Sequence, residues 1–415
     1  MTAKQKIDDL NFTPPAAITE LAAKVKDFVK DKIIPYETDP RWTAHGPTDE
    51  LRIEMNELAR AAGVFAPQVP KEYGGQALSQ VGRAHVFEAA GYSILGPTAI
   101  HCASPDEGNI HLLDVVARPD QREHFLKRMA TGEIRSIFCM TEPGGAGADP
   151  SNLRTKAVYD GEHFVVNGLK WLITGADNAG FAIIFCDVEA KDGRPGGPTM
   201  LLTDMDADGI VLERQLDTLD SSFTNGHWEV AFRDLRIPVG NVLGEVGEGF
   251  RYVQVRLAPA RLTHCMRWLG GARRAHRIAV SYAAERQAFG QPIGRHEGVG
   301  FMLADNEIDL QSARLLIWWA ASLLDAGEKG RHESSMVKTA VSEMLFRIAD
   351  RCVQILGGLG ITRDTVVEQI FRETRAFRIY DGPSETHRWA LARSILKQAG
   401  QDARLAGFGR YETGA

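Results

Sequence analysis

The sequence has little of what marks several large classes of protein. Its 415 residues include five cysteines, an odd number without CxxC spacing, which argues against a disulfide scaffold or a zinc knuckle and predicts a reducing compartment. No apolar run approaches the roughly 18 residues that a membrane span needs, and the first residues lack the apolar core of a signal peptide. Acidic residues outnumber basic ones, 54 to 48, so nucleic-acid binding has little electrostatic support. These absences predict a soluble cytoplasmic protein, and the length favours an enzyme.

The first block of the chain, residues 1–135, predicts a helical domain. Apolar residues recur at helical spacing over 18–33. A second helix is expected after Thr48, ending at Gly63, and a third from Pro119.

The last block, residues 248–399, predicts a four-helix bundle, because long segments with helical spacing are joined by short connections. These segments are 257–287, 296–326, 332–356 and 383–398. The polar, glycine-rich residues 400–415 predict a loosely held tail.

Between the helical blocks, residues 136–247 change to the short runs that are typical of strands. Asp-Gly and Asn-Gly pairs separate these runs and favour the left-handed turns of tight hairpins. The runs are 136–140, 163–168, 181–186, 199–203 and 227–232. The whole chain therefore predicts a mainly α protein with a central antiparallel β barrel or sandwich.

Two of the segments suited to binding a ligand lie in the predicted sheet. Residues 141–149 (TEPGGAGAD) form a glycine-rich loop whose backbone N–H groups suit a ring carbonyl or a phosphate. The loop matches neither a Walker loop nor a dinucleotide fingerprint, and alone it is more typical of a plain loop. Residues 167–175 predict a turn and a strand ending at Thr174, whose hydroxyl is a donor to a ring nitrogen or an ordinary strand side chain.

Three more segments lie at helix ends. Arg286 and Phe289 are either a cation at a helix C-terminus with a core ring, or a guanidinium for a pyrophosphate with a ring against a flat cofactor. Residues 354–360 (QILGGLG) contain more glycine than a helix cap requires. Asp381 precedes a Gly-Pro helix start, so it is a helix cap or a carboxylate directed into a cleft.

In this order on a helix–sheet–helix chain, these segments resemble the FAD-dependent acyl-CoA dehydrogenases over about residues 15–398. Asp381 follows Gln354 by 27 residues, which is the separation in that family between the Gln of its QxxGGxG motif and the catalytic carboxylate.

Finer matches resemble the branch of the family that includes kinase-fused members with an Asp base. They are residues 102–109 (CASPDEGN), residues 261–267 (RLTHCMR), the extra residue between Thr141 and Asp149, and Asp-Gly-Pro at 381–383 in place of Glu-Gly-Thr.

The resemblance implies α,β-dehydrogenation of an acyl-CoA thioester to a trans-2-enoyl-CoA. Asp381 would take the α-proton, the β-hydrogen would leave as hydride to flavin N5, and the electrons would pass to an electron-transfer flavoprotein. The developing enolate would be stabilised by a flavin ribityl hydroxyl and the backbone N–H of Asp381. FAD sites built across subunits imply a homo-oligomer, a dimer or a tetramer. The resemblance also implies that the reaction belongs to fatty-acid β-oxidation and that the site binds no metal ion.

The resemblance also implies individual contacts. Arg286 and Phe289, from a neighbouring subunit, would hold the pyrophosphate side of FAD, and Gln354 with its glycines the adenosine side. The FAD-binding residues implied are Met140, Thr141, Gly147, Thr174, Arg286, Phe289, Gln354, Gly357, Gly358, Ser384 and Glu385. The substrate-binding residues implied are Ala148, Arg261, Gly382 and Arg393.

Four positions depart from the family pattern. Asp381 is one methylene shorter than Glu, so its carboxylate reaches roughly 1.5 Å less. Leu172 stands where many members have a Trp over the flavin, Ala148 where a Ser meets the CoA arm, and Pro383 where a Thr lies near the FAD. The departures are compatible with a bulky or branched acyl group, and the branch handles long, branched or 4-hydroxylated (phosphorylated) acyl groups.

Two other functions stay open. An Asp base is also typical of the flavin nitroalkane oxidases of this fold, which would turn over with oxygen and without CoA. A non-catalytic, flavin-bearing scaffold would bind FAD without being bleached by acyl-CoA, and the presence of Asp381 argues against it.

Several remaining polar residues have structural interpretations. His264 and Cys265 point to different helix faces and have no partner at ligand spacing, so a metal site is not expected. Asp106 and Asn109 are equally compatible with a helix cap and with a wall of the substrate site. His387 is expected on a helix surface.

Overall fold

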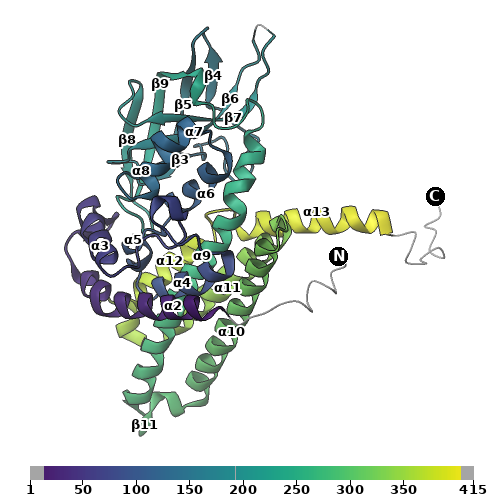
Figure 1. Ribbon diagram of the computed structural model, residues 1–415. Coiled ribbons are helices and arrows are strands. Elements are labelled where there is room, and N and C mark those ends of the chain that lie inside the picture. The colour runs from purple at the N-terminus through teal and green to yellow at the C-terminus, as the bar shows by residue number, and fades with distance from the viewer. Residues whose placement is uncertain (1–13, 192, 403–415) are drawn as a thin grey trace, which may run out of the picture.

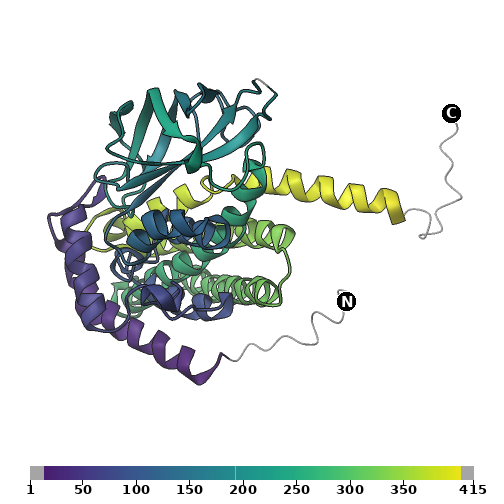
Figure 2. The same ribbon diagram turned by 45° about the horizontal axis from the view of Figure 1, so that its top comes forward.

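The computed structural model describes residues 14–191 and 193–402. A β domain lies at one end of a helical body, and the last helix, α13 (Ser384–Asp402), extends sideways from that body (Figure 1). A second view places the sheet on one side of the stacked helices (Figure 2). The order of helices, sheet and helices is the predicted one.

The N-terminal helices cover one side of the body. Thr48 caps the second predicted helix, because its hydroxyl accepts a hydrogen bond from the N–H of Leu51 at 3.3 Å. Three helices were not predicted, α4, α5 and α6. α6 buries Asp106, Glu107 and Asn109 beside its leucines, so it has no clean apolar stripe. The helices are α2 (Ala16–Phe28), α3 (Asp49–Ala61), α4 (Gln80–Ala90), α5 (Gly96–Ala99), α6 (Asp106–Val116), α7 (Pro119–Gln121) and α8 (Lys127–Ala130).

The C-terminal helices pack around α9 (Gly249–Glu285), a helix of 37 residues. α10 (Glu297–Asp325) and α11 (Arg331–Leu356) lie against it, and α12 (Val367–Phe377) is a separate helix that the sequence pattern did not predict. α13 continues to Asp402, past its predicted end at 398, and the rest of the predicted tail, 403–415, lies outside the described residues. None of the described helices is long and apolar enough to cross a membrane.

Glycines let α4 and α9 approach closely. A Cβ on Gly91 would collide with the backbone carbonyl of Arg267, and a Cβ on Gly270 with that of Glu88. This contact brings the middle of α9, with His264 and Arg267, against the segment that follows α4.

The β domain is one seven-stranded sheet with the order β3-β6-β4-β5-β9-β8 and β7 paired with β6. Most pairs are antiparallel, but β3 and β4 both pair with β6 in parallel, a detail that alternation of apolar residues does not encode. β4 and β8 were not predicted, since they are short and half exposed. The strands are β3 (Ser136–Cys139), β4 (Lys156–Tyr159), β5 (His163–Thr174), β6 (Phe181–Val188), β7 (Gly197–Asp204), β8 (Ile210–Leu216) and β9 (His227–Pro238).

The predicted turn at Asn167 and Gly168 is wrong. Both residues lie inside β5, at a bulge in its pairing with β9. A Cβ on Gly168 would collide with the side chain of Thr155, so this glycine serves close packing rather than a turn. The pair at Asn225 and Gly226 does form a turn, directly before β9.

A buried ion pair joins β5 to the glycine-rich loop. Lys170 Nζ lies 2.8 Å from Glu142 Oε1 and also donates to the carbonyl of Phe185 at 2.6 Å. The Glu142 carboxylate accepts from the backbone N–H groups of Arg154 and Thr155 at 2.7 and 3.0 Å. Burial raises the pKa of Glu142, but the hydrogen bond and charge of Lys170 outweigh it and lower that pKa to about 2. The pair therefore fixes where the loop leaves the sheet.

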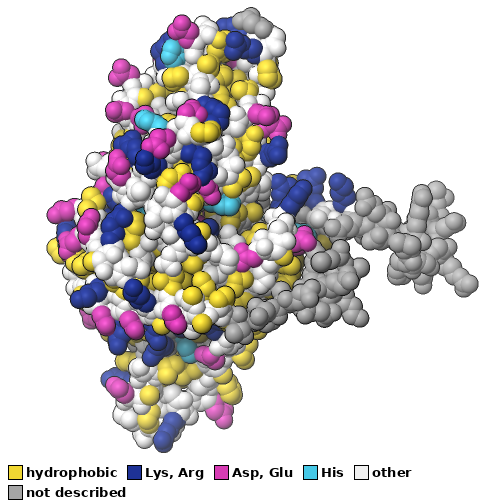
Figure 3. Space-filling view, viewed as in Figure 1, with side chains coloured by type: hydrophobic (Ala, Val, Ile, Leu, Met, Phe, Trp, Pro, Cys, Tyr) yellow, Lys and Arg dark blue, Asp and Glu magenta, His cyan; other side chains and the backbone are white. Residues whose placement is uncertain are grey.

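Charged residues of both signs are interspersed over the face seen in Figure 3, without a large region of one sign. Lys156 and Asp187 form an exposed pair on the same sheet at 2.6 Å, which offers a matched comparison for the buried pair.

The Lys170→Met variant leaves the Glu142 carboxylate buried without its cation, so we expect a loss of about 3–5 kcal/mol in the free energy of unfolding, measured by urea denaturation. The Lys156→Met control breaks an exposed pair and is expected to cost less than about 1 kcal/mol. Equal losses for the two variants would contradict a structural role for the buried pair.

Candidate active site

Asp381 lies in the turn between α12 and α13 with a left-handed backbone, φ +54°. This conformation is unfavourable for a residue with a Cβ, and it persists only where surrounding contacts over-determine it.

Three side chains from three helices hold this turn. Arg261 of α9 donates from Nε to the carbonyl oxygen of Asp381 at 3.2 Å, and His387 Nε2 of α13 lies 3.1 Å from the same oxygen. Lys338 of α11 donates from Nζ to the carbonyl of Gly382 at 2.7 Å. The turn is therefore fixed by the bundle rather than by its own sequence.

His387 is buried, so the expectation of a surface histidine is wrong. Because its ring covers Gly382 and reaches back to Asp381, the helix start folds over the turn. Burial lowers the pKa of His387 to about 4, so the neutral ring donates its Nε2–H at physiological pH. Burial also lowers the pKa of Lys338 to about 8.

The Asp381 carboxylate itself is left with an open acceptor. Its Oδ2 is buried and makes no hydrogen bond to any described residue. His264 Nε2 lies 3.4 Å away, and burial together with Arg267, Arg256 and Lys338 lowers the pKa of His264 well below its ordinary value. The histidine is therefore a neutral neighbour rather than the partner of an ion pair.

His264 was not predicted as a site residue. Its ring is held beside those of Tyr380 and Phe377, with centroids 4.9 and 5.9 Å apart. More than a hundred positions separate it from Asp381, and only packing of α9 against the turn brings the two together.

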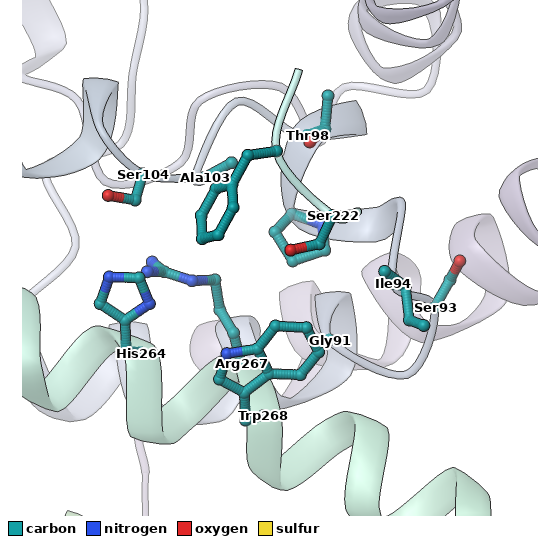
Figure 4. Close-up of a pocket in the computed structure, with 12 residues that line it drawn as sticks. Gly91, Ser93, Ile94, Thr98, Ala103, Ser104, Ser222, His264, Arg267 and Trp268 are labelled. Atoms are coloured by element: carbon teal, nitrogen blue, oxygen red, sulfur yellow. The ribbon is translucent and has the colours of Figure 1, made fainter. Parts of the chain in front are cut away.

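A small cavity opens beside His264. His264, Arg267 and Trp268 project into it from α9, opposite Ser104 and Ser222 (Figure 4). Arg267 is 5% exposed and donates from Nη1 to the carbonyl of Cys102 at 2.8 Å. Its Nη2 has no hydrogen-bond partner among the described residues, so a buried cationic donor is free at this cavity.

A second small cavity adjoins the first, since both are lined by Thr98, Ala103 and Ser104. Thr174 and Asp106 also line it. Asp106 Oδ1 accepts from the backbone N–H of Ser136 at 2.8 Å, so this residue both fixes the start of β3 and forms a wall of the site. Thr174 thus lines the same composite cleft as His264, the neighbour of the Asp381 carboxylate.

Asn109 has a structural contact instead. It donates to the hydroxyl of Ser136 at 2.8 Å and accepts from Arg256 Nε at 2.7 Å.

The other predicted residues fall into separate regions. Met140 and Thr141 follow β3, while Gly147 and Ala148 are exposed in the loop beyond them. Arg393 is exposed on α13 over the ring of Trp389, 4.6 Å away, and makes no contact with Asp381 among the described residues. Ser384 is buried and Glu385 exposed at the start of α13.

Arg286 and Phe289 lie far from the sheet. Arg286 ends α9, and Phe289 lies in the hairpin formed by β10 (Gln287–Ala288) and β11 (Gln291–Pro292), at the end of the molecule opposite the β domain (Figure 1). Phe289 is 95% exposed. Gln354, Gly357 and Gly358 are also exposed, and a Cβ on either glycine would meet nothing within 4 Å. One chain therefore does not bring these residues to Thr174.

Models of three protein domains match successive parts of the chain. They describe the N-terminal, middle and C-terminal domains of acyl-CoA dehydrogenase and match residues 16–133, 137–235 and 247–396. The chain belongs to the acyl-CoA dehydrogenase family. Its central sheet between helical domains is the fold of this family.

Comparison with individual proteins supports the same family assignment. Acyl-CoA dehydrogenase family member 11 of Gallus gallus is 33% identical over 92% of this chain and 51% of its own length. The chain therefore spans about half the length of the first curated relatives that it matches. The probable acyl-CoA dehydrogenase FadE2 of Mycobacterium tuberculosis is 31% identical over 94% of this chain and 98% of its own. The structure of a putative acyl-CoA dehydrogenase from Mycobacterium abscessus superposes with a TM-score of 0.86 at 33% identity, covering 93% of this chain and 99% of that one.

The donor set fits the flavin that this family implies. The cleft beside Thr174 is lined by hydroxyl groups together with the cationic side chains of Arg52 and Arg135, and Gly147 and Ala148 are exposed in the glycine-rich loop. No cluster of three or more His, Cys, Asp or Glu side chains suited to a metal occurs among residues 14–191 and 193–402.

We expect the His387→Leu variant to be less stable by about 1–2 kcal/mol, because the buried carbonyl of Asp381 loses a donor. His387→Gln, whose amide can donate to the same carbonyl, should recover part of the loss in thermal denaturation.

The exposed neighbour Arg388 offers a control on the same helix, and Arg388→Leu should change stability by less than about 0.5 kcal/mol. A His387→Leu protein as stable as wild type would mean that the histidine does not support the turn.

Proposed function

We propose that the protein catalyses FAD-dependent α,β-dehydrogenation of an acyl-CoA thioester to a trans-2-enoyl-CoA in the cytoplasm, with Asp381 as the base for the α-proton. Bound FAD would supply the acceptor for the two electrons that the substrate loses, and an electron-transfer flavoprotein would remove them. All five cysteines are free and buried, which is compatible with a reducing compartment.

The observation that carries this proposal is the buried, unpartnered Oδ2 of Asp381, which lies 3.4 Å from His264, a residue that lines a cavity. A base must present a free lone pair where the acidic C–H is held, and a neutral His264 leaves that lone pair available. The fixed turn also holds the backbone N–H of Asp381 in one direction. This N–H makes no hydrogen bond to a described residue. This N–H is suited to the thioester oxygen, where negative charge develops as the proton leaves.

Met140, Thr141, Gly147 and Thr174 would hold the flavin and its chain, with Ser384 and Glu385 nearby. Arg286, Phe289, Gln354, Gly357 and Gly358 would hold the rest of the cofactor from other subunits. Ala148, Arg261 and Gly382 remain candidate contacts for the acyl-CoA, and Arg393 is the least supported of these. Their exposure or position beside Asp381 is compatible with these roles.

An oligomer is supported by two features. Arg286 and Phe289, the candidate pyrophosphate residues, lie at the opposite end of the molecule from the β domain that carries Thr174. A complete site therefore needs a second copy of the chain. Phe301, Ile308 and Leu315 form an exposed apolar stripe on α10 with a spacing of seven residues, and each is at least half exposed. A homodimer or homotetramer would cover such a stripe.

The substrate would carry a polar group on its acyl chain. The cavity beside His264 is mostly apolar, but Arg267 and Ser104 also line it, and a buried guanidinium with a free donor favours an oxygen-bearing substituent over a plain alkyl chain. Among the acyl groups of this branch, the 4-hydroxylated or phosphorylated ones fit this chemistry best.

The Asp381→Asn variant tests the reaction. Anaerobic mixing with acyl-CoA should bleach the flavin absorbance of the wild type, and loss of the base should slow bleaching by roughly 10²–10⁴-fold. The purified variant should retain its FAD, because the substitution removes a charge and little volume.

Other outcomes identify the rival functions. Bleaching by a nitroalkane with oxygen consumption, and none by any acyl-CoA, would make the protein an oxidase. A yellow protein that no substrate bleaches would be a scaffold, and a protein without FAD would overturn the proposal.

Arg267→Met tests the substrate class. Loss of a charged hydrogen bond should lower kcat/KM for a 4-hydroxyacyl-CoA by roughly 10- to 100-fold relative to the unsubstituted acyl-CoA of equal length. The control is Arg277→Met, which removes an exposed arginine further along α9. Equal losses on both substrates would make Arg267 a structural residue.

A further inference from the structure

Thr174 has a buried partner behind it. Thr174 ends β5 and His227 opens β9, and the two residues are directly opposite in the antiparallel register. His227 is 8% exposed, and its Nδ1 lies 3.1 Å from Thr174 Oγ1. Its Nε2 lies 3.0 Å from Oδ2 of Asp220, so both ring nitrogens are occupied.

Asp220 is the anionic member of this cluster. Burial raises its pKa, but the hydrogen bond and charge of His227, with the hydrogen bond from Thr218, together outweigh burial, and the pKa is lowered overall. Burial and the charge of Asp220 raise the pKa of the neighbouring Glu373 to about 8, so Glu373 is neutral at pH 7. Glu373 accepts from the N–H of Ser221 at 2.6 Å and the hydroxyl of Ser222 at 2.8 Å, which fixes the loop that carries Asp220.

The direction of the Thr174 hydroxyl follows from this arrangement. A carboxylate only accepts, so the proton that joins His227 to Asp220 sits on Nε2. If Nδ1 carries no proton, it accepts the O–H of Thr174, and the threonine turns lone pairs toward the cleft. If Nδ1 is protonated, it donates to Thr174, whose own hydrogen is then free to point into the cleft.

We propose that His227, oriented by Asp220, is a positioning residue that sets whether Thr174 presents a hydrogen or a lone pair to the flavin ring. This inference rests on the proposed function, which places FAD against Thr174. A ring nitrogen of the flavin is an acceptor when the cofactor is oxidised and carries a hydrogen when it is reduced. The direction of one hydroxyl therefore biases the balance between the two states.

Phe223 lies between this cluster and the catalytic turn, with its ring 5.4 Å from that of His227 and 6.0 Å from that of Tyr380. Trp268 Nε1 donates to the hydroxyl of Tyr380 at 2.5 Å, and burial, with the nearby Glu373 and Asp220, raises the pKa of Tyr380 well above its ordinary value. Tyr380 precedes Asp381, so the side of the cleft at Thr174 and the base share a rigid set of buried polar groups.

The experiment compares the midpoint reduction potential and absorption spectrum of bound FAD in four proteins. They are the wild type, Thr174→Val, His227→Leu and the double variant. Thr174→Val should shift the potential, and His227→Leu should shift it in the same direction. If the histidine acts through the threonine, the double variant should show no shift beyond that of Thr174→Val alone.

The control is His163→Leu. His163 lies at the opposite end of β5 from Thr174, so this substitution should leave the reduction potential of the flavin unchanged. His227→Gln, whose side chain can still bond to Thr174, should restore part of the wild-type potential, and it replaces His227→Leu if that variant does not fold.

The outcomes separate this inference from the function on which it rests. A shift for Thr174→Val with none for either His227 variant, or additive shifts in the double variant, would overturn the positioning role alone. No shift for Thr174→Val would mean that the flavin does not contact this residue, which overturns both the inference and this part of the proposed cofactor site.

Discussion

The strained turn at Asp381 is the constraint on which the site depends. A left-handed aspartate is unfavourable in isolation, and here Arg261, Lys338 and His387 hold its carbonyl groups from three different helices. Because α9 and α11 belong to the bundle core and His387 is buried at the start of α13, the turn that carries the carboxylate is fixed against that core. The carboxylate then needs no hydrogen bond of its own, and its Oδ2 stays open. In the proposed role of base, an aspartate is one methylene shorter than glutamate, so it depends all the more on the backbone being held in place.

The remaining parts of the site follow from close packing between domains. Small residues in α4 and α9 let the two helices touch, which sets Arg267 and His264 against the segment at Ala103 and Ser104. On the other side, the ion pair between Glu142 and Lys170 fixes the strands from which the glycine-rich loop and Thr174 emerge. The two adjoining cavities lie where these fixed surfaces meet, so the cleft is a product of domain contacts rather than of any single motif.

Much of this organisation could be predicted from the sequence. Period and turn chemistry predicted the three blocks, and the spacing from Gln354 to Asp381 singled out the aspartate. The residues around that aspartate could not be found in the same way. His264 and His387 look like ordinary helix residues, and the sequence has no signal for a side chain that reaches across the bundle. His227 could not be predicted for a similar reason, because only the pairing register of β5 and β9 places it behind Thr174. Local patterns encode elements, whereas these contacts depend on long-range packing.

The central claim is that the Asp381 carboxylate removes the α-proton of an acyl-CoA. The most direct measurement is hydrogen exchange at the α-carbon of a 3-thia-acyl-CoA, which can be deprotonated but not dehydrogenated, in D₂O with the FAD-loaded protein. The account predicts that the wild type incorporates deuterium at the α-carbon and that FAD-loaded Asp381→Asn does not. Exchange at the same rate in both proteins, or none in the wild type, would contradict it.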